Sequence, residues 1–227
     1  MSGHVTALFG IAPEKFQKTC IIMPFDIPRA ARNLGVAAMT QGRVFSCGQG
    51  QGFTLIRSGM GAGFVGDCTL YLAETPCEKI LFLGTCGLIR RRDNLDVGSL
   101  VIPGTIHAFE SFSAIVKGTL NTSEPVQADE TLTRTFPCPR QNCVSFASLH
   151  EEEKHIALFD QLDARIIEME CSAFFLACRK IGRASGALLV VADILQEKVF
   201  CAALPSSDKK SLTEGISQAC SYLKKIV

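Results

Sequence analysis

The chain has 227 residues, 47% of them hydrophobic, and its 23 basic and 22 acidic side chains leave a formal net charge of +1. This balance lacks the basic excess of a nucleic-acid-binding protein, and no apolar run reaches the ~20 residues that cross a bilayer. Because the N-terminus shows no signal-peptide pattern, we expect a cytoplasmic protein that binds neither nucleic acid nor membrane.

Eleven cysteines are scattered singly along the chain, without a C-x-x-C pair. Disulfide scaffolds are usually short secreted chains, and zinc sites need tighter spacing. We therefore predict reduced, mostly buried thiols. The histidines do not cluster with the acids, so we predict no metal site, and no organic cofactor is implied.

Short apolar runs alternate with helical patterns in the N-terminal half. The runs predict strands over 20–23, 43–47, 53–57 and 80–83, with the glycine-rich turn 48–52 joining the second and third. The helical patterns cover 28–34 and 61–74.

The C-terminal half continues this alternation. Strands are predicted over 99–103, 106–112, 165–169 and 187–193, and helices over 151–162, 170–181 and 207–227. Ser207 or Asp208 is the predicted N-cap of the last helix. The proline-containing segment 117–141 is predicted to be surface loop.

Continuous apolar strands between helices indicate an α/β protein. We predict one domain over 1–227, with three layers: a mixed central β-sheet flanked by helices on both faces. In open α/β sheets, ligands bind beyond the carboxyl ends of the strands. Glycines, hydroxyls and acids gather at the predicted strand ends, at 58–61, 84–87, 168–170 and 192–193.

Two carboxylates flank Met169 at the junction of a predicted strand and helix. Glu168 and Glu170 follow two β-branched apolar residues and precede an amphipathic run. Because a buried carboxylate loses its hydration, it needs a partner. A ligand rich in hydroxyls or cations would supply one. The alternative is that these acids flank the helix N-terminus, where the helix dipole favours negative charge.

Five motifs occur in the same order as in a known family. They are Pro24-Phe25-Asp26-Ile27-Pro28-Arg29, Ser58-Gly59-Met60-Gly61, Gly84-Thr85-Cys86-Gly87-Leu88 with 96–103, Glu168-Met169-Glu170 and Val191-Ala192-Asp193. Together they resemble the nucleoside phosphorylase superfamily, which includes purine nucleoside phosphorylases, uridine phosphorylases and nucleosidases. The resemblance covers nearly the whole chain and implies cleavage of the N-glycosidic bond of a small-molecule nucleoside, with a purine base expected.

The resemblance implies a ribose site at the Glu168–Glu170 junction. Glu170 would accept hydrogen bonds from the ribose 2′- and 3′-hydroxyls, since a carboxylate offers only acceptors and a diol two donors. Met169 would lie beneath the sugar. For Glu168, ribose binding and helix capping both stay open.

The resemblance also implies a base site. Asp193 matches the acid that donates a proton to N7 of the leaving purine, which requires a carboxyl that holds a proton near neutral pH. An N-cap for a following helix is the alternative. The other residues that the resemblance places at the base are Cys86, Gly87, Leu149 and Phe200.

The nucleophile pocket departs from the family pattern. Its matching residues are Arg29, Thr85 and Gly61, with Arg43 as a match for a neighbouring subunit's arginine. However, Phe25 replaces a glycine, and Phe82 replaces a phosphate-binding arginine.

These departures leave more than one reaction open. Phosphorolysis, with phosphate as co-substrate, is slightly favoured. The alternatives are a hydrolytic nucleosidase of the methylthioadenosine or futalosine type, and a catalytically weak nucleoside-binding homologue. The hydrolytic members carry a glutamate near the position of Arg29. Family members assemble as dimers, trimers or hexamers, so a homo-oligomer is expected.

Overall fold

A computed structural model describes residues 2–27, 29–91, 94–121, 123–198, 200 and 203–227. Pro28 and Cys201, which belong to the predicted motifs and thiols, lie outside the described residues.

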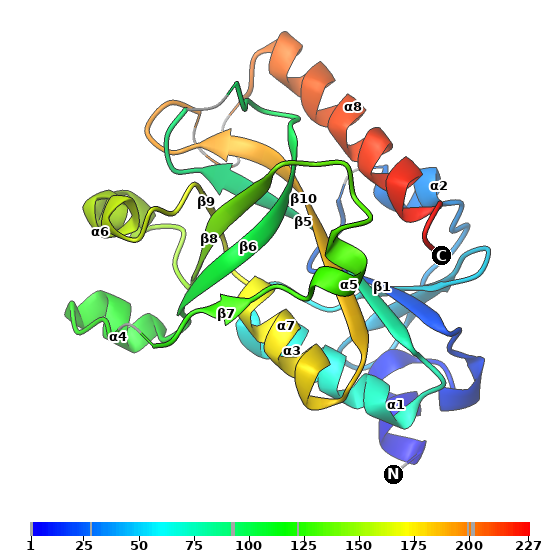
Figure 1. Cartoon of the computed structure of the whole chain (residues 1–227). Helices are drawn as coiled ribbons and strands as arrows, with labels where there is room; N and C mark the ends of the chain where they lie inside the picture. Colours follow the sequence, from blue (N-terminus) through cyan, green and yellow to red (C-terminus); the bar gives the residue numbers. More distant parts are fainter. Residues whose placement is uncertain (1, 28, 92–93, 122, 199, 201–202) are drawn as a thin grey trace.

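The strands are distributed along the whole chain (Figure 1). They are β1 (Thr19–Met23), β2 (Thr40–Gln41), β3 (Ser46–Gln49), β4 (Thr54–Arg57), β5 (Lys79–Leu88), β6 (Leu100–Phe109), β7 (Val126–Gln127), β8 (Arg140–Phe146), β9 (Ile166–Glu168) and β10 (Ala184–Ile194).

The helices connect these strands. They are α1 (Ser2–Phe9), α2 (Ala30–Leu34), α3 (Ala62–Tyr71), α4 (Phe112–Lys117), α5 (Glu130–Thr133), α6 (Ile156–Gln161), α7 (Cys171–Lys180) and α8 (Ser206–Leu223). Short 3₁₀ helices cover Pro13–Lys15, Leu72–Glu74 and Glu152–His155.

The strands form one mixed sheet, as predicted. Its order is β10-β6-β8-β9-β5-β1-β4-β3-β2, with β7 paired to β6. The long strand β5 is parallel to both β1 and β10. Because β10 pairs with β6 as well as with β5, the strands β10, β6, β8, β9 and β5 close into a ring. Strands β1, β4, β3 and β2 extend from β5 as an open sheet.

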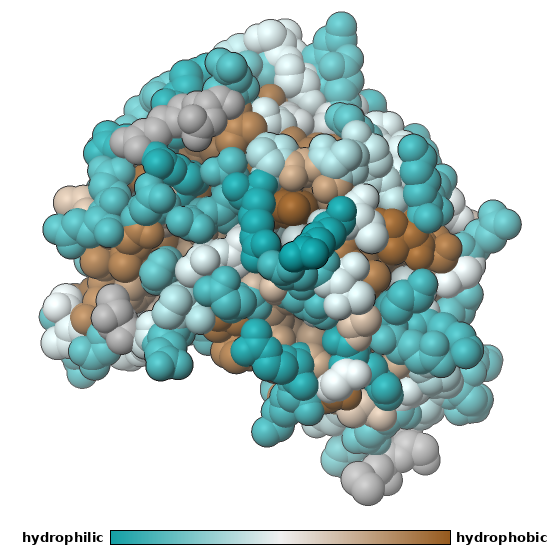
Figure 2. All heavy atoms as spheres, in the orientation of Figure 1, coloured by the Kyte–Doolittle hydropathy of each residue, from teal (hydrophilic) through white to brown (hydrophobic). Residues whose placement is uncertain are grey.

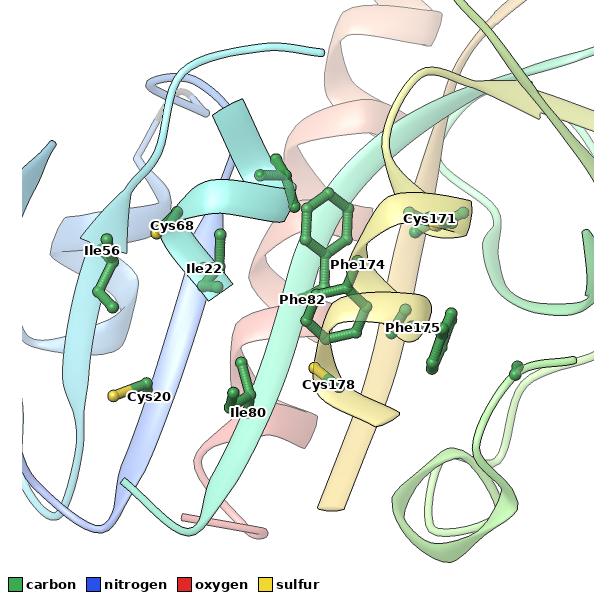
Figure 3. Close-up of a cluster of buried hydrophobic side chains, with 14 of the residues drawn as sticks. Cys20, Ile22, Ile56, Cys68, Ile80, Phe82, Cys171, Phe174, Phe175 and Cys178 are labelled. Carbon is green, nitrogen blue, oxygen red and sulfur yellow. The ribbon is translucent and has the colours of Figure 1, made fainter. Parts of the chain in front are cut away.

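Alternate residues of β5 face opposite layers, as expected of a strand. Phe82 and Ile80 point into the cluster formed with α3 and α7, where the Phe82 and Phe174 ring centroids lie 5.3 Å apart (Figure 3). Leu81 and Leu83 belong to the opposite cluster, which contains the apolar face of α8. The predicted three-layer arrangement is therefore confirmed.

Hydrophilic residues cover much of one face of the molecule, with hydrophobic residues visible between them, notably beside α6 (Figure 2). None of the helices in the described ranges combines the length and apolar character needed to span a membrane. All ten described cysteines are free, and nine are buried, which confirms the predicted thiols for this part of the chain.

The two strands predicted over 99–103 and 106–112 are one strand, β6, which ends at Phe109. Its pairing with β8 shifts register between Pro103 and Ile106. Proline has no N–H for the ladder, so the interruption is an irregularity within a continuous strand. Helix α4 then begins at Phe112, with the Ser111 hydroxyl accepting from the Ala114 N–H at 3.3 Å.

The prediction of a surface loop over 117–141 is wrong in part. This segment contains β7, α5 and the start of β8, a strand that the sequence patterns did not predict. Asp129 fixes the segment, because its carboxylate accepts from the Thr131 N–H at 2.8 Å and from the Ser185 N–H at 3.0 Å. Such long-range contacts leave no periodic signal in the sequence.

The predicted N-cap of the last helix is also wrong. Helix α8 begins at Ser206 with Pro205 as its N-cap, and no side chain caps it. The Asp208 carboxylate instead pairs with the Lys198 ammonium at 2.8 Å. Asp208, in the first turn of α8, therefore forms a tertiary ion pair and does not cap the helix.

Candidate functional site

A pocket lies at the carboxyl end of the parallel strands, as predicted, with an empty volume of about 410 Å³. Strand β5 contributes Thr85, Cys86 and Gly87 to its lining, and β10 contributes Asp193. Strand β9 runs antiparallel to β5 and ends beside it, since Ile167 pairs with Gly87. This arrangement brings the residues after β9 to the same end of the sheet.

A bulge in β10 positions Asp193. The register between β10 and β5 shifts between Val191 and Asp193, so that Asp193 rather than Ala192 lies opposite Gly87. Bulges re-aim side chains in this way. The glycine is needed here, because a Cβ at Gly87 would lie 2.7 Å from Asp193 Oδ2.

Asp193 is 5% exposed. Burial raises the pKa of its carboxyl to about 7. The group can therefore hold a proton near neutral pH, which is what a general acid requires.

Glu168 is held by the protein itself. One carboxylate oxygen accepts from the backbone N–H groups of Glu170 and Cys171, each at 2.6 Å, and the other accepts from the Ser145 hydroxyl at 2.5 Å. These contacts tie the first residues of α7 to the end of β9 and to β8. Glu168 lines the pocket, but its acceptors serve the helix N-terminus.

Glu170 is available to a ligand. Its Oε1 accepts from the Gly61 N–H at 2.6 Å, which links the start of α7 to the start of α3. Gly61 has a φ of 100°, a conformation that favours glycine. Burial and the neighbouring Glu168 raise the pKa of Glu170 to about 8. Glu170 and Met169 both line the pocket, and a carboxyl group has more acceptor sites than one N–H fills.

The predicted base-site residues also meet at this pocket. Leu149 and Phe200 line it together with Cys86 and Gly87. Burial raises the pKa of the Cys86 thiol well above its ordinary value, so this cysteine is a poor candidate nucleophile.

Both predicted arginines lie outside this chain's own pocket, where only Arg29 was expected, since Arg43 was matched to a neighbouring subunit's arginine. Arg29 is exposed, has a left-handed backbone at the start of α2, and does not line the pocket, whereas Phe25 does. Arg43 is exposed in the connection between β2 and β3, at the far edge of the sheet. Phe82 is fully buried in the core, in the cluster with Phe174 of α7, and not at the pocket.

Sequence reasoning missed one of the acids that line the pocket, Glu152. It begins the 3₁₀ helix after Leu149, is 6% exposed and lines the pocket. Burial and the charges of Asp193 and Glu153 raise the pKa of Glu152 to about 8. It follows Glu151 and precedes Glu153 in the chain, so charge composition alone could not mark it as the buried member of the run.

The pocket is acidic. Four carboxyl groups line it, from Glu152, Glu168, Glu170 and Asp193, and no described lysine, arginine or histidine joins them. Within the described ranges, no three or more histidines, cysteines and acids are grouped so that they could hold a metal ion. The site can accept hydrogen bonds, share protons and stabilise positive charge.

The chain matches a family model described as the phosphorylase superfamily over residues 23–227. No match occurs among curated proteins.

Solved structures of three different enzymes are similar in fold. The Campylobacter jejuni 5′-methylthioadenosine/S-adenosylhomocysteine nucleosidase has a TM-score of 0.70 at 15% identity, covering 92% of this chain and 97% of that one. The Bacteroides thetaiotaomicron AMP nucleosidase has a TM-score of 0.69 at 16% identity, covering 100% and 97%. The Vibrio fischeri uridine phosphorylase has a TM-score of 0.71 at 18% identity, covering 92% and 90%.

Proposed function

The chain belongs to the phosphorylase superfamily, and from that membership we propose that it cleaves the N-glycosidic bond of a purine nucleoside, with water as nucleophile. The observation that carries the proposal is the pocket in which buried Asp193 and Glu170 face the same space from different elements.

The two acids have separate tasks in this reaction. Glu170 accepts hydrogen bonds from the ribose diol, above Met169. Asp193 donates its proton to N7 of the purine as the bond to the sugar breaks. A base that is neutralised as it leaves is a better leaving group, so general acid catalysis lowers the barrier.

The acceptor oxygens of the pocket support this bond cleavage. Departure of the base leaves oxocarbenium character on the sugar, and the carboxyl oxygens around it stabilise positive charge there. The pocket offers no comparable partner for phosphate. An anion site needs cationic or well-placed N–H donors, and the described lining residues include no cation.

The sequence motifs slightly favour phosphorolysis. The proposal of water as the nucleophile replaces that prediction. Two of the similar structures are described as nucleosidases, which agrees with hydrolysis. Phosphorolysis stays the second candidate, because the Thr85 hydroxyl lines the pocket where the family holds phosphate. It would require a cation from another copy of the chain.

The test is release of free base from adenosine, inosine and 5′-methylthioadenosine, with and without phosphate. We expect release without phosphate, and no increase when phosphate is added. Asp193→Asn should lower kcat by about 10²–10⁴-fold, because general acid catalysis contributes about that much. Glu124→Gln, an exposed acid outside the pocket, is the matched control.

Each other result has a defined meaning. Release that depends on phosphate would contradict hydrolysis and support phosphorolysis. Binding of nucleosides without any turnover would support the catalytically weak homologue. Full activity of Asp193→Asn would refute the assignment of the general acid.

We further propose that the enzyme works in the cytoplasm as a homo-oligomer.

A further inference from the structure

Another cavity, which we call the amino-end cavity, lies at the start of β10. Its empty volume is about 490 Å³. Residues from β7, α7 and β10 and from the segments beside them line it: Gln127, Asp129, Phe175, Arg179, Arg183 and Ser185. Strand β10 begins beside this cavity and reaches the pocket with Asp193, so the two sites lie at opposite ends of one strand.

Hydrogen bonds join the walls of the amino-end cavity. The Arg179 guanidinium group donates to the backbone carbonyl of Gln127 at 3.0 Å, which ties α7 to β7. The Asp129 carboxylate accepts from the Ser185 N–H at 3.0 Å and from the Ser185 hydroxyl at 3.3 Å, which ties the segment after β7 to β10. The cavity is therefore built by contacts between separate elements of the fold.

The lining offers donors rather than acceptors. The carboxylate of Asp129 already accepts from the Thr131 N–H and from two groups of Ser185. The Nε–H of Arg183, in contrast, is buried and has no acceptor among the residues that the structure describes. A buried donor without an acceptor is unfavourable. Since Arg183 lines the cavity, a ligand rich in acceptor oxygens would supply what the protein does not.

Positive charge surrounds the cavity because three parallel strands begin at this edge of the sheet. Lys18 precedes β1, Lys79 begins β5 and Arg183 precedes β10. All three are close enough to Glu78 to lower its pKa, chiefly through the hydrogen bond from Lys18. With Arg179, these cations outnumber Glu78 and the one acid in the lining. An excess of positive charge attracts anions.

These features match a phosphate group better than a carboxylate. A guanidinium group can donate two parallel N–H groups to two oxygens of one anion. A carboxylate has no oxygen left after one such contact, whereas a phosphate group offers a further oxygen to a second cation. Arg179 and Arg183 line the same cavity, and Ser185 lines it with them.

We propose that the amino-end cavity binds a phosphate group, held by the guanidinium groups of Arg179 and Arg183. Inorganic phosphate and a phosphate monoester carry this group alike. The ligand lies at the opposite end of β10 from Asp193 and takes no part in the cleavage that we propose for the pocket. The site is therefore independent of the proposed function.

Isothermal titration calorimetry of the full chain with inorganic phosphate, at constant ionic strength, tests the proposal. We expect one saturable site per chain. Arg183→Gln and Arg179→Gln should each weaken binding at least about tenfold, because each removes hydrogen bonds between charged groups. Arg32→Gln removes the same charge from an exposed arginine of α2 outside the cavity, and it should change the affinity less than twofold.

Two further ligands test the chemistry of the site. Acetate should bind at least about tenfold more weakly than phosphate, since it cannot contact both guanidinium groups in the same way. Equal binding of the two anions would contradict the choice of phosphate. Glycerol 3-phosphate distinguishes the sources: tighter binding than inorganic phosphate assigns the cavity to an organic phosphate, and weaker binding assigns it to the free ion.

Thr85→Val locates the binding, because Thr85 lines the pocket. Loss of phosphate binding in this variant, with full binding in both arginine variants, would place the anion in the pocket and overturn the proposal. So would equal effects of Arg183→Gln and Arg32→Gln. Phosphate should also raise the thermal midpoint of the wild-type protein but not that of Arg179→Gln, whose exposed side chain can be replaced without unfolding the chain. Failure of base release would leave this result standing.

Discussion

Glu168 and Glu170 are separated by one residue and have different tasks. Glu168 accepts hydrogen bonds from the backbone N–H groups at the start of α7, whereas Glu170 faces the pocket and accepts from one N–H group, that of Gly61. The sequence motif predicted a ligand-binding acid at this junction. Only the hydrogen bonds of the folded chain separate the acid that supports the helix from the acid that faces the pocket with free acceptor sites.

Glu170→Gln should lower kcat/KM for adenosine by about 2–10-fold, because a hydrogen bond between uncharged groups contributes about 0.5–1.5 kcal/mol and an amide has one acceptor oxygen where a carboxyl group has two. The amide oxygen can still accept from Gly61, so the fold should persist. With 2′,3′-dideoxyadenosine, which lacks the diol, the substitution should have little effect. An equal loss on both substrates would contradict the ribose assignment.

Glu152 provides a prediction about pH. Its pKa rises from 4.5 in the unfolded chain to about 8 in the folded one. Between these values the folded state binds more protons, so the contribution of Glu152 to the free energy of unfolding falls as pH rises. Below about pH 4.5 both states are protonated, and this contribution is constant.

Glu152→Gln removes this pH-dependent loss. The thermal midpoint of Glu152→Gln minus that of the wild-type protein should therefore be larger at pH 8 than at pH 5. We expect an increase of at least about 3 °C, since 1 kcal/mol corresponds to about 2–4 °C in a chain of this size. Differential scanning calorimetry at the two pH values measures it. A constant or falling difference would mean that Glu152 is not a buried acid with a raised pKa.

The bulge in β10 is the element that builds the acid end of the pocket. Gly87→Ala would place a methyl group 2.7 Å from Asp193 Oδ2 and 3.2 Å from Ile167 Cγ2. The Asp193 carboxyl can move away, so we expect a fall in kcat of at least about tenfold with only a small loss of stability.

Gly3→Ala is the matched control for this substitution. Gly3 lies in α1, and a Cβ there meets nothing within 4 Å. It should leave kcat unchanged and stabilise the helix by up to about 1 kcal/mol. If Gly87→Ala keeps full activity, the register of the bulge does not position the catalytic carboxyl.

The sequence predicted the elements whose burial pattern is local. Strand β1 and helix α7 carry apolar patterns and lie within one residue of their predicted bounds, whereas β5 continues to Leu88, beyond the predicted 80–83. The features that the sequence did not predict depend on contacts between residues far apart in the chain. Strand β8 completes the ring only between β6 and β9, and Asp208 leaves its capping position for Lys198. Glu152 was missed for the same reason, because its burial comes from the surrounding fold.

At the scale of the whole molecule, exposed apolar side chains surround α3 and α7. Met60, Phe64 and Leu176 are 45%, 53% and 46% exposed, and a shallow groove of small residues lies between the two helices. We expect these side chains to be covered in a homo-oligomer.

Sedimentation velocity should therefore give a species larger than the 24.5 kDa chain. Phe64→Glu should shift it toward the monomer, and Lys210→Glu, on exposed α8, should not. A wild-type monomer at micromolar concentration would contradict the proposed assembly.

The sugar product reports the reaction most directly. Adenosine is incubated with the protein in H₂¹⁸O with phosphate present, and the sugar is analysed by mass spectrometry. The acidic pocket predicts free ribose that carries one ¹⁸O atom, together with adenine. Ribose 1-phosphate would contradict water as the nucleophile, and the absence of any sugar product would contradict cleavage of the glycosidic bond.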